Sequence, residues 1–269
     1  MNANGLYNGL EGYIVPGTNS GMGMGVANGL VGEIGDKLVY DLKNCTFWLD
    51  PSNIVGVNDL DRISSWVDKF KNYTYDISVA QPRLILNDSN FNNQPIVDFD
   101  TVSRGLAVTT GPLLNLRTTT LVMVYQYLSS SANSGLSYQS RVISDNDRST
   151  GPRNSGYSYL WGKNNNGSLI NATGFYQPSN TGGLVTTGTL FNTNKYVVVV
   201  NVNLWTANNT LISNDLSVVP SWRINALGGD ALGYSGVFKL GEILLFNELF
   251  TLDRATYITN RLNAKYNIF

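Results

Sequence analysis

The end of the chain, residues 234–269, constrains the fold most, because it joins an apolar strand to a short capped helix. Residues 243–246 are Ile-Leu-Leu-Phe, which predicts a buried strand. Thr251 suits the N-cap position of the helix, and Lys265 falls in its last turn, where the helix dipole favours a cation. Apolar residues at spacings of 3, 4 and 4 predict one buried helix face, formed by Ala255, Ile258, Leu262 and Tyr266.

Four short segments in the first hundred residues form a second feature through the order in which they occur. They are Trp48-Leu49-Asp50, Trp66-Val67-Asp68-Lys69, Gln81-Pro82-Arg83-Leu84 and Pro95-Ile96-Val97-Asp98-Phe99-Asp100. Further strand-like runs recur along the chain with Gly, Asn and Pro between them, which is typical of an all-β sandwich.

The order of these segments, together with the Glu242-Ile243 strand and the Leu262-x-x-Lys265-Tyr266 helix end, resembles the concanavalin A-like, laminin-G-like jelly-roll domains of phage and bacterial surface proteins. The resemblance covers residues 44–268. It implies an all-β, two-sheet antiparallel jelly-roll sandwich with a short C-terminal helix. It implies function only by analogy, because this fold serves lectins, hydrolases and structural modules alike.

The composition limits the classes of partner. Only 14% of the residues are charged, against roughly 25% in ordinary soluble proteins, and 34 of the 269 residues are Asn. The net charge of −1 and the scattered Lys and Arg residues argue against nucleic-acid binding. The sequence contains no run of about 20 apolar residues, so it predicts no membrane span. The single cysteine, Cys45, lies in an apolar run and is expected to be a buried structural thiol.

Residues 1–43 differ from the rest of the chain. Ten of the first 35 residues are Gly, and the apolar runs between them are too short for a separate core. We expect an extended N-terminal docking arm (1–43) ahead of the jelly-roll domain (44–269); the alternative is a mobile tail with one added edge strand. Residues 1–7 lack the basic and apolar parts of a signal peptide, so we expect synthesis in a host cytoplasm and delivery to a virion.

Catalysis has few candidate residues. The chain has no histidine, which removes the usual general base and the Ser/His/Asp and Cys/His pairs. A glycosidase would need two converging carboxylates. Glu242 and Glu248 lack the middle Asp of the jelly-roll glucanase pattern, and their spacing is one residue too long. Asp98 and Asp100 fit the structural strand end of the family. We therefore expect no enzyme activity.

Calcium is the metal that the chain could hold. Asp145 and Asp147, with Asn146 and Ser149, supply the oxygen ligands that calcium prefers, and residues 58–61 supply a second set. Neither set forms a full motif, so solvated turn carboxylates are the alternative.

A glycan site is suggested by one aromatic strand with amides beside it. Sugars stack on aromatic rings while amides bind their hydroxyls. Tyr157, Tyr159 and Trp161 share one strand face, because alternate residues of a strand point the same way. The candidate residues are Tyr157, Tyr159, Trp161, Asn164, Asn165, Asn166 and Tyr176. If that face packs on the other sheet, these residues belong to the core instead.

We therefore expect a non-enzymatic virion structural protein, such as a phage decoration, head-fibre or tail-associated adhesion protein. Residues 1–43 would bind other virion proteins, and the jelly roll would bind host surface glycans from many copies. A bacterial cell-surface or secreted carbohydrate-binding module is the alternative. A glycan hydrolase or lyase is the third hypothesis, which mutation of Asp98, Asp100, Glu242 and Glu248 would test.

Overall fold

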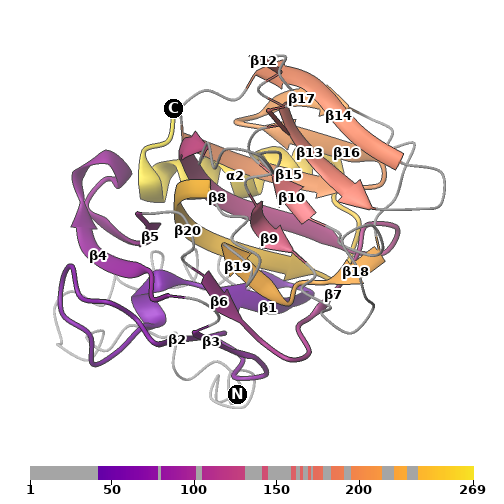
Figure 1. Cartoon of the computed structure of the whole chain (residues 1–269). Helices are drawn as coiled ribbons and strands as arrows, with labels where there is room; N and C mark the ends of the chain where they lie inside the picture. Colours follow the sequence, from indigo (N-terminus) through magenta and orange to yellow (C-terminus); the bar gives the residue numbers. More distant parts are fainter. Residues whose placement is uncertain are drawn as a thin grey trace, which may run out of the picture. The chain divides into compact units, whose positions relative to one another are not determined.

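In the computed structural model, Asn44–Phe269 form one unit, which is built of two β-sheets and a C-terminal helix (Figure 1). The described residues are 42–77, 80–100, 105–130, 141–144, 159–161, 164–165, 169–170, 172–177, 183–190, 195–213, 221–228 and 236–269. The prediction of an extended arm therefore lies almost entirely outside the described residues.

The first sheet has eight antiparallel strands. Its order is β17 (Thr210–Ser213), β16 (Leu204–Ala207), β15 (Lys195–Asn201), β8 (Thr120–Ser130), β20 (Gly236–Phe246), β5 (Gln94–Phe99) and β4 (Arg83–Asp88). The eighth strand, β1 (Cys45–Leu49), pairs with residues 243–246 of β20, whereas β5 pairs with residues 238–240. The long strand β20 therefore pairs with two strands that lie far apart in the sequence, β1 at the start of the unit and β5.

The second sheet also has eight antiparallel strands. Its order is β14 (Gly183–Leu190), β13 (Ala172–Gln177), β10 (Tyr159–Trp161), β9 (Arg141–Ser144), β19 (Ala226–Gly228), β6 (Gly105–Ala107), β3 (Thr74–Ile77) and β2 (Ser65–Val67). Smaller elements complete the described part. They are the pairs β11 (Asn164–Asn165) with β12 (Leu169–Ile170) and β7 (Leu113–Asn115) with β18 (Ser221–Arg223), and the 3₁₀ turns η2 (Pro51–Asn53) and η3 (Ser89–Phe91).

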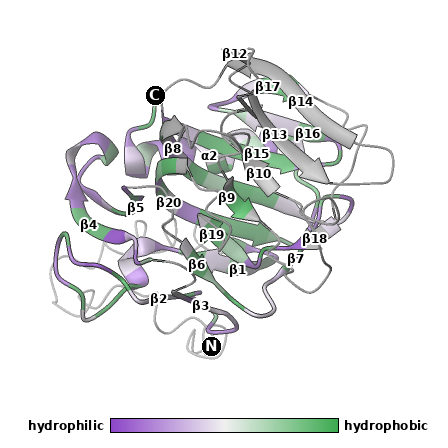
Figure 2. Ribbon diagram, viewed as in Figure 1, coloured by the Kyte–Doolittle hydropathy of each residue, from purple (hydrophilic) through white to green (hydrophobic). Residues whose placement is uncertain are grey.

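The core lies where the inner faces of the two sheets meet. Alternate residues of the first sheet enter it, among them Leu121, Met123 and Tyr125 of β8. The second sheet contributes Leu106, Leu227 and Ile143, which follow one another across β6, β19 and β9. The largest fully buried side chains include Trp66, Trp205 and Tyr75. Figure 2 shows the hydrophobic residues concentrated in the central strands of both sheets.

The helix α2 (Leu252–Tyr266) covers the outer face of the first sheet, and the predicted helix is confirmed. The Oγ1 atom of Thr251 accepts a hydrogen bond from the backbone N–H of Arg254, and Asn267 ends the helix in the left-handed conformation. All four residues of the predicted stripe are buried. Because both faces of this sheet are covered, runs such as Val197–Val200 and Ile243–Phe246 are apolar throughout.

The predicted two-sheet antiparallel sandwich with a C-terminal helix is therefore confirmed. Within the described ranges, no helix combines the length and the apolar character needed to cross a membrane.

Candidate functional site

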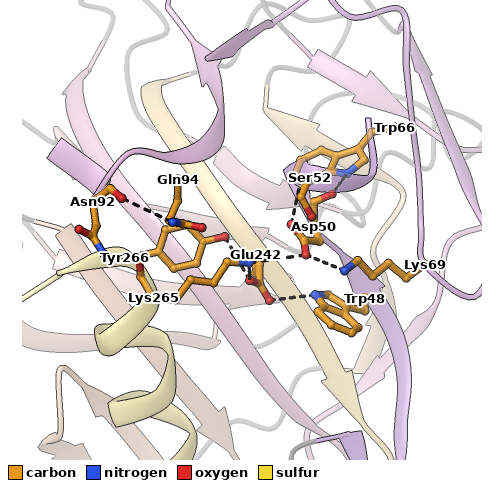
Figure 3. A network of polar contacts seen from close by, with 10 residues as sticks. All are labelled: Trp48, Asp50, Ser52, Trp66, Lys69, Asn92, Gln94, Glu242, Lys265 and Tyr266. Atoms are coloured by element: carbon orange, nitrogen blue, oxygen red, sulfur yellow. Dashed lines mark hydrogen bonds and ion pairs between the residues drawn. The ribbon is translucent and has the colours of Figure 1, made fainter. Parts of the chain in front are cut away.

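A buried polar network lies on the outer face of the first sheet, next to the end of α2 (Figure 3). It brings together four segments: the end of β1 with Trp48 and Asp50, Lys69 after β2, Glu242 of β20, and the last turn of α2. These are the segments that carry the jelly-roll resemblance. Segments that are far apart in the sequence therefore meet in one cluster in the structure.

A β-bulge places Glu242 in this network. Between Leu240 and Ile243, strand β20 has one residue more than β8, whose residues Tyr125 and Met123 pair with them. Leu240 and Ile243 both enter the core, so the extra residue lies on the outer face. Gly241 beside it has no room for a side chain, because a Cβ there would lie 2.9 Å from Cγ1 of Val124. The bulge therefore needs glycine next to Glu242.

The Glu242 carboxylate is satisfied on both oxygens. Its Oε2 accepts a hydrogen bond from Nε1 of Trp48 at 2.9 Å, while its Oε1 lies 2.5 Å from Nζ of Lys265 and 3.1 Å from the hydroxyl of Tyr266. Burial raises the pKa of Glu242, and the nearby Lys265 ammonium opposes that rise. Burial works to lower the pKa of Lys265, but the Glu242 and Asp50 carboxylates outweigh it and raise that pKa.

Asp50 is the second buried acid of the network. Its Oδ2 lies 2.7 Å from Nζ of Lys69 and 3.6 Å from Nζ of Lys265, and its Oδ1 accepts a hydrogen bond from the backbone N–H of Ser52. Burial alone would raise the pKa of Asp50, but the two ammonium groups outweigh it and lower that pKa. Two acids and two bases thus neutralise one another, which fits a structural role better than catalysis.

The other carboxylates weighed for catalysis are dispersed. Glu248 accepts a hydrogen bond from Nδ2 of Asn44 at the start of the unit. Asp100 binds both terminal nitrogens of Arg62, at 2.8 and 2.9 Å, and lies 3.2 Å from Arg83. Asp98 is buried between the ladder positions of Arg83 and Lys239.

The Oδ1 atom of Asp98, like Oε1 of Glu248, is buried and finds no hydrogen-bond partner among the described residues. Burial raises the pKa of Asp98, while the nearby Lys239 ammonium works in the opposite direction. An unsatisfied buried carboxylate of this kind costs stability when it is ionised.

The calcium candidates Asp145 and Asp147 lie outside the described residues. In the second set, Asp59 accepts a hydrogen bond from the backbone N–H of Leu86, and Asp61 accepts two from Asn58. These carboxylates fix the turn. No cluster of three or more Asp, Glu or Cys residues that could hold a metal ion occurs in the part of the chain that the structure describes.

Of the glycan candidates, Tyr157 and Asn166 lie outside the described residues. Asn164 and Asn165 form β11, which pairs with β12 and with neither large sheet. Tyr159 and Trp161 belong to β10, and Tyr176 lies on β13 directly opposite Tyr159. The ladder therefore brings Tyr159 and Tyr176 together and leaves Asn164 and Asn165 in a separate ribbon.

The register also assigns a face to these positions. Leu160 pairs with Ile143, which is fully buried in the core. Successive positions of a strand alternate between faces, and paired positions share one. The positions of Tyr159, Trp161 and Tyr176 thus lie on the outer face of the second sheet. The row of Tyr159 continues through Ser144, Ala226 and Ala107 to Asp76. Along this row Ala226 is fully buried, Ala107 is half-buried and Asp76 is exposed.

Sequence reasoning missed the polar network, although its signal is present. Glu242 interrupts an apolar run that is otherwise typical of a core strand, and Asp50 directly ends another. A charged residue in such a run needs a partner of opposite charge.

No protein-family model and no curated protein matches this sequence. Among solved structures, the chain is similar to domain 4 of AbnA, an extracellular GH43 arabinanase from Geobacillus stearothermophilus, in complex with arabinotriose. The sequence identity is 11% and the TM-score 0.56, over 80% of this chain and 98% of that domain. It is also similar to Trypanosoma rangeli sialidase in complex with sialic acid, with 12% identity and a TM-score of 0.50 over 82% of this chain. The likeness covers only 33% of the length of the sialidase. These likenesses establish the β-sandwich fold.

Proposed function

We propose that this chain is a non-enzymatic glycan-binding β-sandwich that a virus particle displays to its host. One observation carries the proposal: the ladder gives Tyr159 and Tyr176 paired positions on the face opposite the core, with Trp161 two residues from Tyr159. Aromatic residues that share a sheet face can stack against sugar rings, whose apolar faces resemble small hydrophobic surfaces.

The arabinanase domain supports the same proposal. That domain is solved with arabinotriose bound, and this chain covers 98% of it. A sandwich of this kind can therefore accommodate an oligosaccharide without a second domain. In this chain the four carboxylates weighed for catalysis lie apart or in ion pairs, so binding without hydrolysis is the better proposal.

The first experiment measures binding of the full chain to an immobilised glycan panel that includes arabino-oligosaccharides. Tyr159→Ala and Tyr176→Ala should each lower the affinity at least tenfold, while Tyr257→Ala on α2 is the matched control, because α2 packs on the other sheet. Circular dichroism would verify that each variant is folded. Unchanged affinity in both tyrosine variants would contradict the proposed site. Binding to no glycan of the panel would contradict the glycan-binding function.

The virion part of the proposal concerns residues 1–43. Their Gly-rich composition and the low charge of the whole chain support an arm that becomes ordered against other virion proteins. Many displayed copies would then multiply weak binding by single sites. The test compares incorporation of the full chain and of residues 44–269 into particles. Equal incorporation, or absence from particles, would argue against the arm.

An exported bacterial carbohydrate-binding module is the second candidate. The arabinanase likeness favours it, because that enzyme is extracellular. Recovery of the protein from cell surfaces or culture medium in uninfected bacteria would support this candidate over the virion.

A further inference from the structure

We propose that the outer face of the first sheet carries a second binding site, in which Asp98 and Arg83 hold a hydroxyl group of a neutral sugar. This site is on the other sheet from Tyr159 and Tyr176, and its side chains are among those that the structure describes. The inference rests on the proposed glycan-binding function for the class of its ligand.

A row of polar residues crosses the outer face of the first sheet. It runs Arg83–Asp98–Lys239–Gln126 across the paired strands β4, β5, β20 and β8. The adjacent position of each strand lies in the core, where the residues are Leu84, Val97, Leu240 and Tyr125. Because successive residues of a strand point to opposite faces, the polar row points away from the core.

Asp98 is the acid of this row, and its two neighbouring cations bind other carboxylates. Nζ of Lys239 lies 2.5 Å from Oδ2 of Asp88, and a terminal nitrogen of Arg83 lies 3.2 Å from Oδ2 of Asp100. Asp98 is 9% exposed, and its Oδ1 atom has no hydrogen-bond partner in the described part of the chain. Since buried polar atoms nearly always have a partner, an acceptor left in this state suits a ligand.

Arg83 offers the matching donor. Its Nε atom is also buried without a partner among the described residues, and Arg83 is directly opposite Asp98 on the ladder. A hydroxyl group can donate to a carboxylate and accept from an N–H at the same time, so one hydroxyl would satisfy both atoms. The Arg83 side chain is 35% exposed, so its movement can admit a ligand to the two buried atoms.

The charges around Asp98 favour a neutral ligand. Three carboxylates and three cations balance here: Asp88, Asp98 and Asp100 with Arg62, Arg83 and Lys239. A cationic ligand would meet Arg83 and Lys239, and an anionic ligand would meet Asp98 itself. A sugar hydroxyl brings no charge that must lose its water, and its hydrogen bond to a carboxylate is charge-assisted.

The unsatisfied carboxylate also lowers the stability of the free protein, as residues of binding sites often do. Because the row is entirely polar, binding depends on hydrogen bonds, and we expect this site to be weaker than the aromatic positions of the second sheet.

The experiment uses the full chain with Tyr159→Ala and Tyr176→Ala, so that the site on the first sheet is observed by itself. Arabinotriose and lactose are titrated while NMR records the backbone amide signals, and we expect shifts at Arg83, Asp98 and Lys239. Adding Asp98→Asn should lower the affinity about tenfold, because the charge-assisted hydrogen bond is lost. Arg83→Lys keeps the charge that faces Asp100 but removes Nε, so it should also weaken binding.

Asp253→Asn, which changes an exposed acid on α2, is the matched control and should bind as the parent does. Loss of affinity in Asp98→Asn cannot be ascribed to misfolding if thermal melting shows the variant to be at least as stable as its parent. Should the double tyrosine variant not fold, the same substitutions in the wild-type chain serve, with the amide signals of β4 and β5 as the readout.

The outcomes separate this site from the proposed function. Equal affinity in Asp98→Asn, or no shifts in β4 and β5, overturns the inference and leaves the tyrosine site to its own test. Tighter binding of 3′-sialyllactose than of lactose at β4 and β5 would overturn the assignment to a neutral sugar. If the wild-type chain binds no glycan of the wider panel, the proposed function fails and this inference fails with it.

Discussion

Replacing Lys265 with Met tests the reasoning about the buried network most directly. The Lys265 side chain is 31% exposed, whereas that of its partner Glu242 is 3% exposed. Lys265→Met keeps the length of the side chain and removes its charge. Glu242 would then remain buried with hydrogen bonds from Trp48 and Tyr266 but without a cation at 2.5 Å.

Breaking a buried ion pair in this way typically costs 3–5 kcal/mol. We expect about 3 kcal/mol, the lower end, because two hydrogen bonds to Glu242 remain and Lys69 still pairs with Asp50. For a domain of this size, the melting temperature should fall by about 6–12 °C. Chemical denaturation followed by tryptophan fluorescence would measure the free energy of unfolding.

The cost should depend on pH. Burial already raises the pKa of Glu242, and loss of Lys265 raises it further. A carboxyl with a raised folded-state pKa binds more protons in the native state than in the unfolded state, so it removes stability as pH rises through that range. The difference between Lys265→Met and wild type should therefore be smaller at acidic than at alkaline pH.

Two further variants complete this test. Adding Glu242→Gln to Lys265→Met should recover much of the loss, because the remaining side chain is neutral. Lys71→Met, which removes an exposed lysine, should change stability by less than about 0.5 kcal/mol. A loss below about 1 kcal/mol for Lys265→Met, or a loss that does not vary with pH, would refute the view that Glu242 depends on its ion pair.

Three other predictions concern single residues. Asp98→Asn should raise the free energy of unfolding by roughly 0.5–1 kcal/mol at neutral pH, because Oδ1 of Asp98 lacks a partner and burial raises the pKa of this carboxyl. Since a carboxyl with a raised pKa removes stability as pH rises, the gain should vanish in acid. A variant that is destabilised at neutral pH would contradict this. Gly241→Ala should cost about 1–3 kcal/mol through overpacking against Val124, measured by thermal melting, and a neutral effect would mean that the bulge can shift. Cys45, for which the sequence predicts burial, is only half-buried, yet desolvation raises the pKa of its thiol to about 12. The native thiol should therefore react with Ellman's reagent more slowly than in urea, and equally rapid labelling would contradict this.

The fold could be predicted where its determinants are local. The helix cap at Thr251 and the stripe from Ala255 to Tyr266 depend on residues a few positions apart, so sequence spacing was sufficient. The network around Glu242 could not be derived from spacing, because its partner Trp48 is 194 residues away.

Bulges limited the prediction of the site in the same way. The extra residue in β20 sets where Glu242 lies. Alternation along a strand does not predict this position, because a bulge shifts the register by one residue. Alternation predicts a shared face for Tyr159 and Trp161, whereas the assignment of that face depends on the pairing of Leu160 with Ile143.

The pairing of β1 with the last strand has a consequence for how the protein is made. During synthesis, the sheet partner of Cys45–Leu49 (residues 243–246) and the Glu242 partner of Trp48 are made 194 or more residues later, so the first strand of the unit cannot pair with β20 until those residues have left the ribosome. Contacts between such distant residues slow folding, and unpaired apolar strands in the meantime invite aggregation. We expect expression at lower temperature, or with chaperones that shield nascent strands, to raise the yield of folded protein.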